Sequence, residues 1–96
     1  MFAVIFRASV ADLDDQYFKT AEQMRRLALE NYGCLEFISM KEGDQEIAIS
    51  YWETEEAIQA WKKDSEHLAA QQKGIDIWYN FYEVEVVKVI RKYSSK

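Results

Sequence analysis

The order in which two hydrophobic periodicities alternate along the chain constrains the fold more than any other feature of the sequence. Strand-like alternation is expected at Phe2–Val10, Leu35–Met40, Ile47–Trp52 and Trp78–Lys92. Helical spacing fills the intervals from Asp12 to about Asn31 and from Thr54 to about Lys73. This order predicts one α+β domain over residues 1–96, with the ferredoxin-like order β-α-β-β-α-β. A four-stranded antiparallel sheet would carry the two main helices on one face.

Local signals set the expected boundaries of these elements. Asp12 is the expected N-cap of the first helix. Asp64 can cap a second helical segment within the later helical interval. Gly33 and Gly74 follow helical patterns, where the position after the C-cap favours glycine, and Gly43 predicts a hairpin turn between two strands.

The strands are apolar on both faces. Phe37 and Ile38 point to opposite sides of one expected strand, and Tyr51 and Trp52 do so in another. The chain also has three Trp, six Tyr and five Phe, too many large rings for one small core. Two helices can cover only one face of the sheet, so we expect a second copy to cover the other. The sequence therefore predicts a homodimeric α+β barrel, and the alternative is a second face that stays half-exposed.

Composition excludes several classes of function. The net charge is −5, and acids surround the basic pairs Arg25–Arg26 and Lys62–Lys63, so we expect neither a nucleic acid nor an anionic membrane as a partner. Cys34 and His67 are the only cysteine and histidine, which excludes an internal disulfide and a structural zinc site. No apolar run approaches transmembrane length, and the first residues do not form a signal peptide. We therefore expect a cytoplasmic protein with neither a metal nor a bound cofactor.

The stretch Ser50–His67 resembles the antibiotic biosynthesis monooxygenase family. Three shorter stretches, Ala69–Gln71, Trp78–Tyr82 and Gly33–Leu35, extend the resemblance over nearly the whole chain. The family fold that this resemblance implies is the dimeric α+β barrel, in agreement with the periodicity. Members of the family include cofactor-free oxygenases of anthrone-like or quinol substrates, and enzymes that degrade haem. Fold-level likeness transfers the architecture better than the reaction.

Three residues are candidate catalytic groups. Trp61 could line a pocket and donate its indole N–H to a substrate oxygen, or it could anchor the helix in the core. His67 is the one side chain that titrates naturally near neutral pH, and Gln71 lies one helical turn later on the same face. The two could act as base and donor, although His67 could equally be a surface residue.

Six further residues are candidate substrate-binding groups: Arg7, Ser9, Tyr51, Trp52, Trp78 and Tyr82. Among them, Arg7 could neutralise an oxyanion or pair with Glu83 or Glu85 across the sheet.

Two classes of function fit these residues. The first is cofactor-independent oxygenation of a small electron-rich aromatic, which needs a base, hydrogen-bond donors and an apolar pocket. The second is a non-catalytic dimeric module that binds a small hydrophobic ligand or acts in a stress response. Haem degradation is the weaker possibility. The resemblance implies a proximal His ten residues after the pocket Trp, and that position holds Gln71, ten after Trp61.

Overall fold

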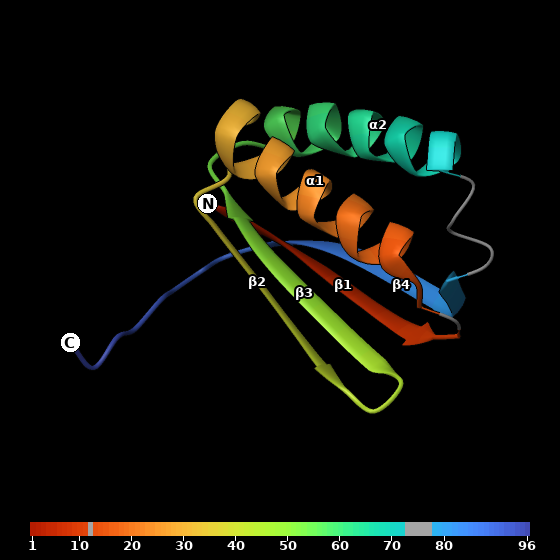
Figure 1. The fold of residues 1–96 in the computed structure, drawn as a ribbon. Coiled ribbons are helices and arrows are strands. Elements are labelled where there is room, and N and C mark those ends of the chain that lie inside the picture. The colour runs from red at the N-terminus through yellow and green to blue at the C-terminus, as the bar shows by residue number, and fades with distance from the viewer. Residues whose placement is uncertain (12, 73–77) are drawn as a thin grey trace.

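The computed structural model describes residues 1–11, 13–72 and 78–96, and for residues 67–72 it describes the backbone alone. Its elements, in chain order, are β1 (Phe2–Val10), α1 (Asp15–Asn31), β2 (Glu36–Glu42), β3 (Gln45–Trp52), α2 (Glu55–Gln72) and β4 (Tyr79–Lys88) (Figure 1). The predicted β-α-β-β-α-β order is therefore confirmed.

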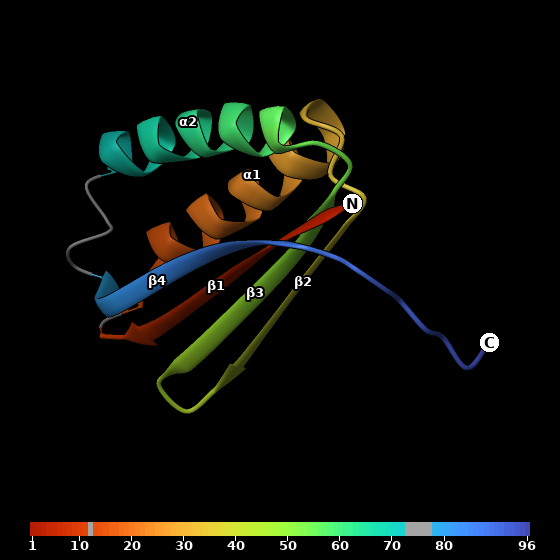
Figure 2. The ribbon, with the colours of Figure 1, turned by 180° about the vertical axis from the view of Figure 1, so that it is seen from behind.

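The four strands form one antiparallel sheet in the order β2-β3-β1-β4. Both helices lie on the same side of this sheet, as the ribbon shows from front and back (Figures 1 and 2). We call this side the helix face and the other side the outer face. Along β1 the even-numbered residues, such as Val4 and Phe6, point to the helix face. In the register, Val4 pairs with Ser50 and Val86, so β3 and β4 also present their even-numbered residues to that face.

A bulge changes this parity at the start of β4. The register shifts between Ser9 and Val10, so that Val10 pairs with Tyr79 while Ala8 pairs with Tyr82. An extra residue in one strand turns the side chains that follow to the other face. The bulge therefore places Tyr79 and Tyr82 together on the helix face.

The first helix begins later than predicted. Its N-cap is Asp14 instead of Asp12, and the Asp14 side chain accepts a hydrogen bond from the backbone N–H of Tyr17 at 2.8 Å. Asp12 lies outside the described residues. At the other end of α1, Gly33 has a φ of 76°, the left-handed conformation that favours glycine after a helix. The predicted role of Gly33 is confirmed, whereas Gly74 lies outside the described residues.

The later helical interval is one continuous helix, not two segments. Thr54 caps α2 by accepting a hydrogen bond from the backbone N–H of Ala57 at 3.2 Å, as predicted. Asp64 lies inside this helix and does not cap a second segment. Its carboxylate accepts a hydrogen bond from the hydroxyl of Tyr32, at the end of α1. An acidic side chain that resembled a local cap therefore serves as a contact between the helices.

The C-terminal strand is shorter than predicted. It ends at Lys88 instead of Lys92, because the last residues run past the end of its partner strand β1. The backbone N–H of Val89 still donates to the carbonyl of Met1 at 3.0 Å, and the chain then extends away from the domain (Figure 2). The predicted hairpin is confirmed: β2 and β3 are joined by a two-residue turn at Gly43, whose φ is 60°.

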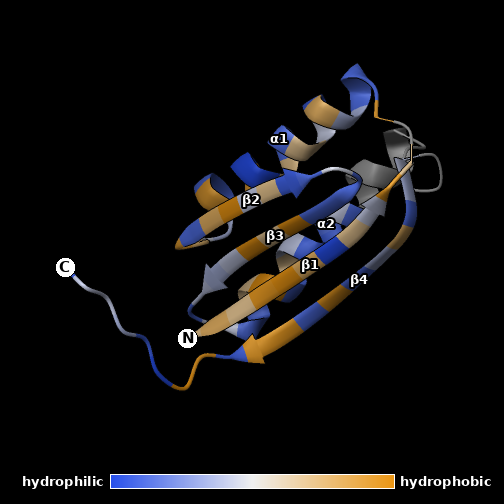
Figure 3. Cartoon of the chain, turned by 90° about the horizontal axis from the view of Figure 1, so that it is seen from below, coloured by the Kyte–Doolittle hydropathy of each residue, from blue (hydrophilic) through white to orange (hydrophobic). Residues whose placement is uncertain are grey.

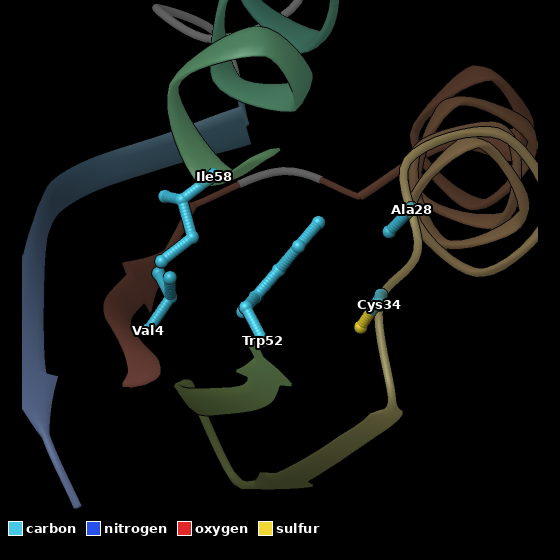
Figure 4. Close-up of a cluster of buried hydrophobic side chains, with 5 residues drawn as sticks. All are labelled: Val4, Ala28, Cys34, Trp52 and Ile58. Atoms are coloured by element: carbon cyan, nitrogen blue, oxygen red, sulfur yellow. The ribbon is translucent and has the colours of Figure 1, made fainter. Parts of the chain in front are cut away.

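The core lies at one end of the space between the helices and the sheet. It is a cluster of buried residues from both helices, two strands and the segment after α1, with the Trp52 ring between the others (Figure 4). Trp52 is fully buried, and its indole N–H donates to the Ser50 hydroxyl at 2.8 Å. The pair satisfies two polar groups inside an apolar cluster, which a buried Trp requires.

The outer face of the sheet is apolar and uncovered. It carries bands of hydrophobic residues across the strands (Figure 3). Met40 is 73% exposed there, Phe81 58% and Ile47 44%. The two-sided apolar pattern predicted from the sequence is therefore present in the fold. Among the described residues, no helix is both long enough and apolar enough to cross a membrane.

Candidate functional site

A cavity of about 850 Å³ separates the helices from the sheet. Its size lies within the range of small-molecule binding sites. Aromatic rings form much of its wall, contributed by both helices, by three strands and by the residue before β4. These rings are Phe6, Tyr17, Phe18, Phe37, Trp61, Trp78, Tyr79 and Tyr82. The cavity could therefore take an aromatic ligand by ring-to-ring packing.

At one end of the cavity, aromatic rings gather near a carboxylate. The Tyr17 ring lies 5.5 Å from the Trp78 ring and 6.1 Å from the Tyr79 ring, centroid to centroid, and Phe6 meets Tyr79 edge-on at 5.5 Å. The Tyr17 hydroxyl donates to Oε1 of Glu46, near the start of β3. We call Tyr17, Glu46, Trp78 and Tyr79 the tyrosine end of the cavity.

Burial changes the acidity of both tyrosines at this end. Burial is the largest cause that raises the pKa of Tyr17 far above its ordinary value, and the hydrogen bond to Glu46 adds to it. Burial also raises the pKa of Tyr79, and the negative charge of Glu46 adds to it. Both hydroxyls are therefore neutral at physiological pH and can act only as neutral hydrogen-bond groups.

The opposite end of the cavity is built around Trp61. Its indole N–H donates to the backbone carbonyl of Met24 in α1 at 2.8 Å. Its ring packs against Trp52 at 5.4 Å and against Phe37 at 6.1 Å. Trp61 therefore ties α2 to α1 and presents its ring to the cavity, while its N–H is already engaged.

Two polar atoms of residues that line the cavity have no hydrogen-bond partner among the described residues. They are Oε2 of Glu46, on the sheet wall, and Oγ of Ser65, on α2. Ser65 is only 8% exposed. Buried polar atoms are nearly always hydrogen-bonded to protein or water, so each of these two requires an explanation.

The family model for antibiotic biosynthesis monooxygenases matches residues 1–73. This chain belongs to that family. Among its relatives, YqjZ of Bacillus subtilis (strain 168), an uncharacterized protein, is 41% identical over 92 residues, which cover 95% of this chain and 81% of YqjZ.

Solved structures of distant similarity share the fold. SnoaB from Streptomyces nogalater, a cofactor-independent oxygenase solved in a mutant form, aligns with a TM-score of 0.74 at 10% identity, covering 95% of this chain and 94% of SnoaB. A mutant of MhuD with two manganese protoporphyrin IX bound per active site aligns with a TM-score of 0.58 at 18% identity, covering 96% of this chain and 98% of MhuD. At these identities the likeness concerns the fold alone.

In this member of the family, three of the candidate residues line the cavity: Trp61, Trp78 and Tyr82. The Trp78 indole N–H donates to Asp14 at 3.2 Å, so this ring also braces the start of α1. Trp52, by contrast, belongs to the core behind the cavity wall. Its ring is fully buried and its N–H is taken by Ser50.

The structure places Arg7, Ser9 and Tyr51 on the outer face, away from this cavity. Arg7 pairs with Glu83 at 2.5 Å, which is the cross-strand pairing considered from the sequence. This ion pair raises the pKa of the Arg7 guanidinium, chiefly through the hydrogen bond to Glu83. These residues therefore contribute to the outer surface of the sheet.

His67 and Gln71 fall within α2, but their side chains lie outside the part of the chain that the structure describes. Their proposed roles as base and donor stay predictions. The helix that carries them also carries Trp61 and Ser65, both of which line the cavity. The backbone placement thus puts both residues on an element of the cavity wall.

Sequence reasoning missed Glu46, Ser65 and the tyrosine end of the cavity. One available signal was the alternation along β3. Glu46 shares a face of this strand with Ala48, Ser50 and Trp52, and the other residues of that face are small or apolar. An acid on the apolar face of a strand is costly unless it has a function or a partner. No group of three metal-binding side chains occurs among the described residues.

Proposed function

We propose that this protein is a cofactor-independent monooxygenase that oxidises a small electron-rich aromatic, such as a quinol or an anthrone, in the cavity between the helices and the sheet. The observation that carries the proposal is the 850 Å³ cavity itself, with eight aromatic rings in its wall. Membership of the monooxygenase family and the fold shared with SnoaB, a cofactor-independent oxygenase, support it.

The chemistry would begin with removal of a proton from the substrate. The resulting anion is rich enough in electrons to reduce O₂ directly. For an anthrone, the ring methylene loses two hydrogens and gains one oxygen atom, and the second oxygen atom leaves as water. The protein would supply a base, an apolar site that excludes water, and donors for the developing charge.

We assign the base to His67 and a donor to Gln71 on the basis of their side-chain chemistry and of the four-residue spacing that puts the two on one face of a helix. Trp61 supplies a wall instead of a donor, since its N–H is engaged by Met24 at 2.8 Å. The wall would hold the planar substrate by stacking and keep it at a fixed distance from α2.

Oxygen uptake with anthrone as the substrate tests this proposal. The wild-type protein should consume one O₂ for each anthraquinone formed. The substitution His67→Ala should lower the rate by roughly 10²-fold or more, the usual contribution of a general base. Lys63→Ala is the matched control, because Lys63 is an exposed residue of the same helix. Binding of anthrone without oxygen uptake would instead favour the non-catalytic ligand-binding module.

We further propose that a second copy of the chain covers the outer face. Met40, Ile47 and Phe81 leave that face exposed and apolar, and an exposed apolar patch of this kind marks an interaction site. The charge of Arg7 on this face is neutralised by its pairing with Glu83. Light scattering should give twice the 11.4 kDa chain mass, and a monomer at micromolar concentration would contradict the proposal.

A further inference from the structure

The unpartnered carboxylate oxygen of Glu46 indicates what kind of ligand the cavity accepts. The two oxygens of this side chain have different surroundings. Oε1 accepts a hydrogen bond from the Tyr17 hydroxyl, whereas Oε2 is buried with no partner among the described residues. A carboxylate oxygen can only accept hydrogen bonds while it is ionised. The missing partner of Oε2 must therefore be a donor.

The surroundings of Glu46 favour a partner from outside the chain. No ion pair within 4 Å includes Glu46 among the described residues. Lys41 lies opposite Glu46 in the strand register and also lines the cavity, but it is exposed to solvent and forms no ion pair with Glu46. The Tyr79 hydroxyl also interacts with Glu46, but it forms no hydrogen bond of good geometry with Oε2, and because both it and the Tyr17 hydroxyl are neutral they do not compensate the charge. Beside Oε2 the Glu46 carboxylate repels a negatively charged ligand group, although the cavity wall as a whole also carries the cations of Arg25, Lys41 and Lys62.

The second unpartnered atom lies on a different wall of the same cavity. Oγ of Ser65 belongs to α2, while Glu46 belongs to the sheet. Both residues line the cavity, whose wall also contains eight aromatic rings. A ligand that satisfies both atoms would have an apolar ring body and polar substituents that reach two walls.

We propose that Glu46 is the binding residue that selects phenolic substrates, by accepting a hydrogen bond from a substrate hydroxyl at Oε2. This rests on the proposed function, and it names the substrate class as neutral hydroxylated aromatics. Ser65 contacts a second polar substituent from α2. The Tyr17 hydroxyl holds Oε1, and this bond orients the carboxylate so that Oε2 points to the ligand.

The proposal explains why an acid lies on the apolar face of β3. A hydrogen bond to an ionised acceptor is roughly twice as strong as one between neutral groups. It strengthens further in a site that excludes water. Glu46 would therefore raise the affinity for a ligand that carries a hydroxyl. An analogue in which an ether replaces that hydroxyl would bind more weakly, because the ether would leave Oε2 unpaired.

The test is anaerobic titration calorimetry with two probes that differ in one methyl group, 4-methoxy-1-naphthol and 1,4-dimethoxynaphthalene. The absence of oxygen separates binding from turnover. Wild-type protein should bind the naphthol at least about tenfold more tightly than the ether, the usual contribution of a hydrogen bond to a charged group. Glu46→Gln should lose most of this preference. Its amide retains the shape and can still accept from Tyr17.

Glu42→Gln is the matched control. Glu42 ends β2 and is exposed, so the substitution removes the same charge without altering the cavity. It should keep the full preference for the naphthol. Circular dichroism confirms that each variant is folded. If Glu46→Gln fails to fold, the two probes still decide the matter with the wild-type protein, because equal affinities would contradict the proposal.

Three other results would overturn the inference. They are a full preference for the naphthol in Glu46→Gln, no binding of either probe at millimolar concentration, and tighter binding of 1-naphthylmethylamine than of the naphthol. The last would show that Glu46 selects cations. Oxygen uptake distinguishes this failure from failure of the proposed function. Turnover of 1,8-dihydroxyanthrone, which carries phenolic hydroxyls, would overturn the inference alone if it were unchanged in Glu46→Gln, whereas Glu46-dependent binding without turnover would overturn the monooxygenase proposal alone.

Discussion

The Trp52–Ser50 pair makes a quantitative prediction about the core. Trp52 is fully buried and Ser50 is 3% exposed, and the indole N–H donates to the hydroxyl at 2.8 Å. The substitution Trp52→Phe removes about three heavy atoms from the cluster, worth about 2 kcal/mol at ~0.8 kcal/mol for each buried methylene equivalent. It also leaves the Ser50 hydroxyl buried without a donor, which costs about 1 kcal/mol more. We expect the free energy of unfolding to fall by about 3 kcal/mol, the sum of the packing loss and the lost hydrogen bond.

A second substitution, Ser50→Ala, tests the hydrogen bond itself in a double-mutant cycle with Trp52→Phe. In the wild-type protein, Ser50→Ala should destabilise by about 1–2 kcal/mol, because it orphans the indole N–H of Trp52. In the Trp52→Phe background the same change removes an orphaned hydroxyl, so it should be neutral or should recover about 1 kcal/mol. Ser50→Ala thus destabilises the wild-type protein but not the Trp52→Phe variant, a difference that loss of packing alone would not produce.

Urea unfolding followed by circular dichroism measures all four proteins without relying on tryptophan fluorescence. Every protein must be compared at one concentration, because association would add to the apparent stability. A domain of this length has roughly 5–14 kcal/mol of stability, so the variants should remain folded. Equal destabilisation by Ser50→Ala in both backgrounds would refute the coupling. Since Trp52 lies behind the cavity wall, Trp52→Phe should keep most of the affinity for 4-methoxy-1-naphthol.

Three further predictions concern the tyrosines, the outer face and haem. Because the pKa values of Tyr17 and Tyr79 are raised in the folded state, stability is intact below the unfolded-state value of about 10 and falls as pH rises above it. Tyrosinate absorbance should therefore show two groups that ionise only as the protein unfolds, and early ionisation of all six would contradict their burial. Ile47→Asp places a charge in the apolar outer face and should shift the mass in light scattering from dimer to monomer, whereas Gln59→Asp on the exposed side of α2 should not. Titration with haemin should give no Soret band typical of histidine ligation, because Gln71 stands at the position of the proximal His. A tight one-to-one complex that bleaches with reductant in air would contradict the prediction that the protein does not degrade haem.

The sequence by itself determined the order and type of the elements. Periods of two and 3.6 residues are local properties, so β1 could be placed at Phe2–Val10 from its alternation alone. The left-handed glycines at positions 33 and 43 were found for the same reason, because their conformation depends on the adjacent turn. The apolar character of both sheet faces was also visible, since alternate residues of a strand must point to opposite sides.

Only the tertiary structure decided which of these residues meet. Glu46 contacts Tyr17 across 29 positions of sequence, and the bulge after Ser9 turns Tyr79 to the same cavity. No local pattern encodes either event, because both depend on strand register and on where α1 crosses the sheet. The same holds for Trp61. Its spacing marks the buried side of a helix, but only the packing of α2 on α1 brings its indole N–H within hydrogen-bond distance of the Met24 carbonyl. The sequence shows which side chains are present and which face of an element they share. Their roles depend on neighbours that are distant in the chain and that only folding brings into contact.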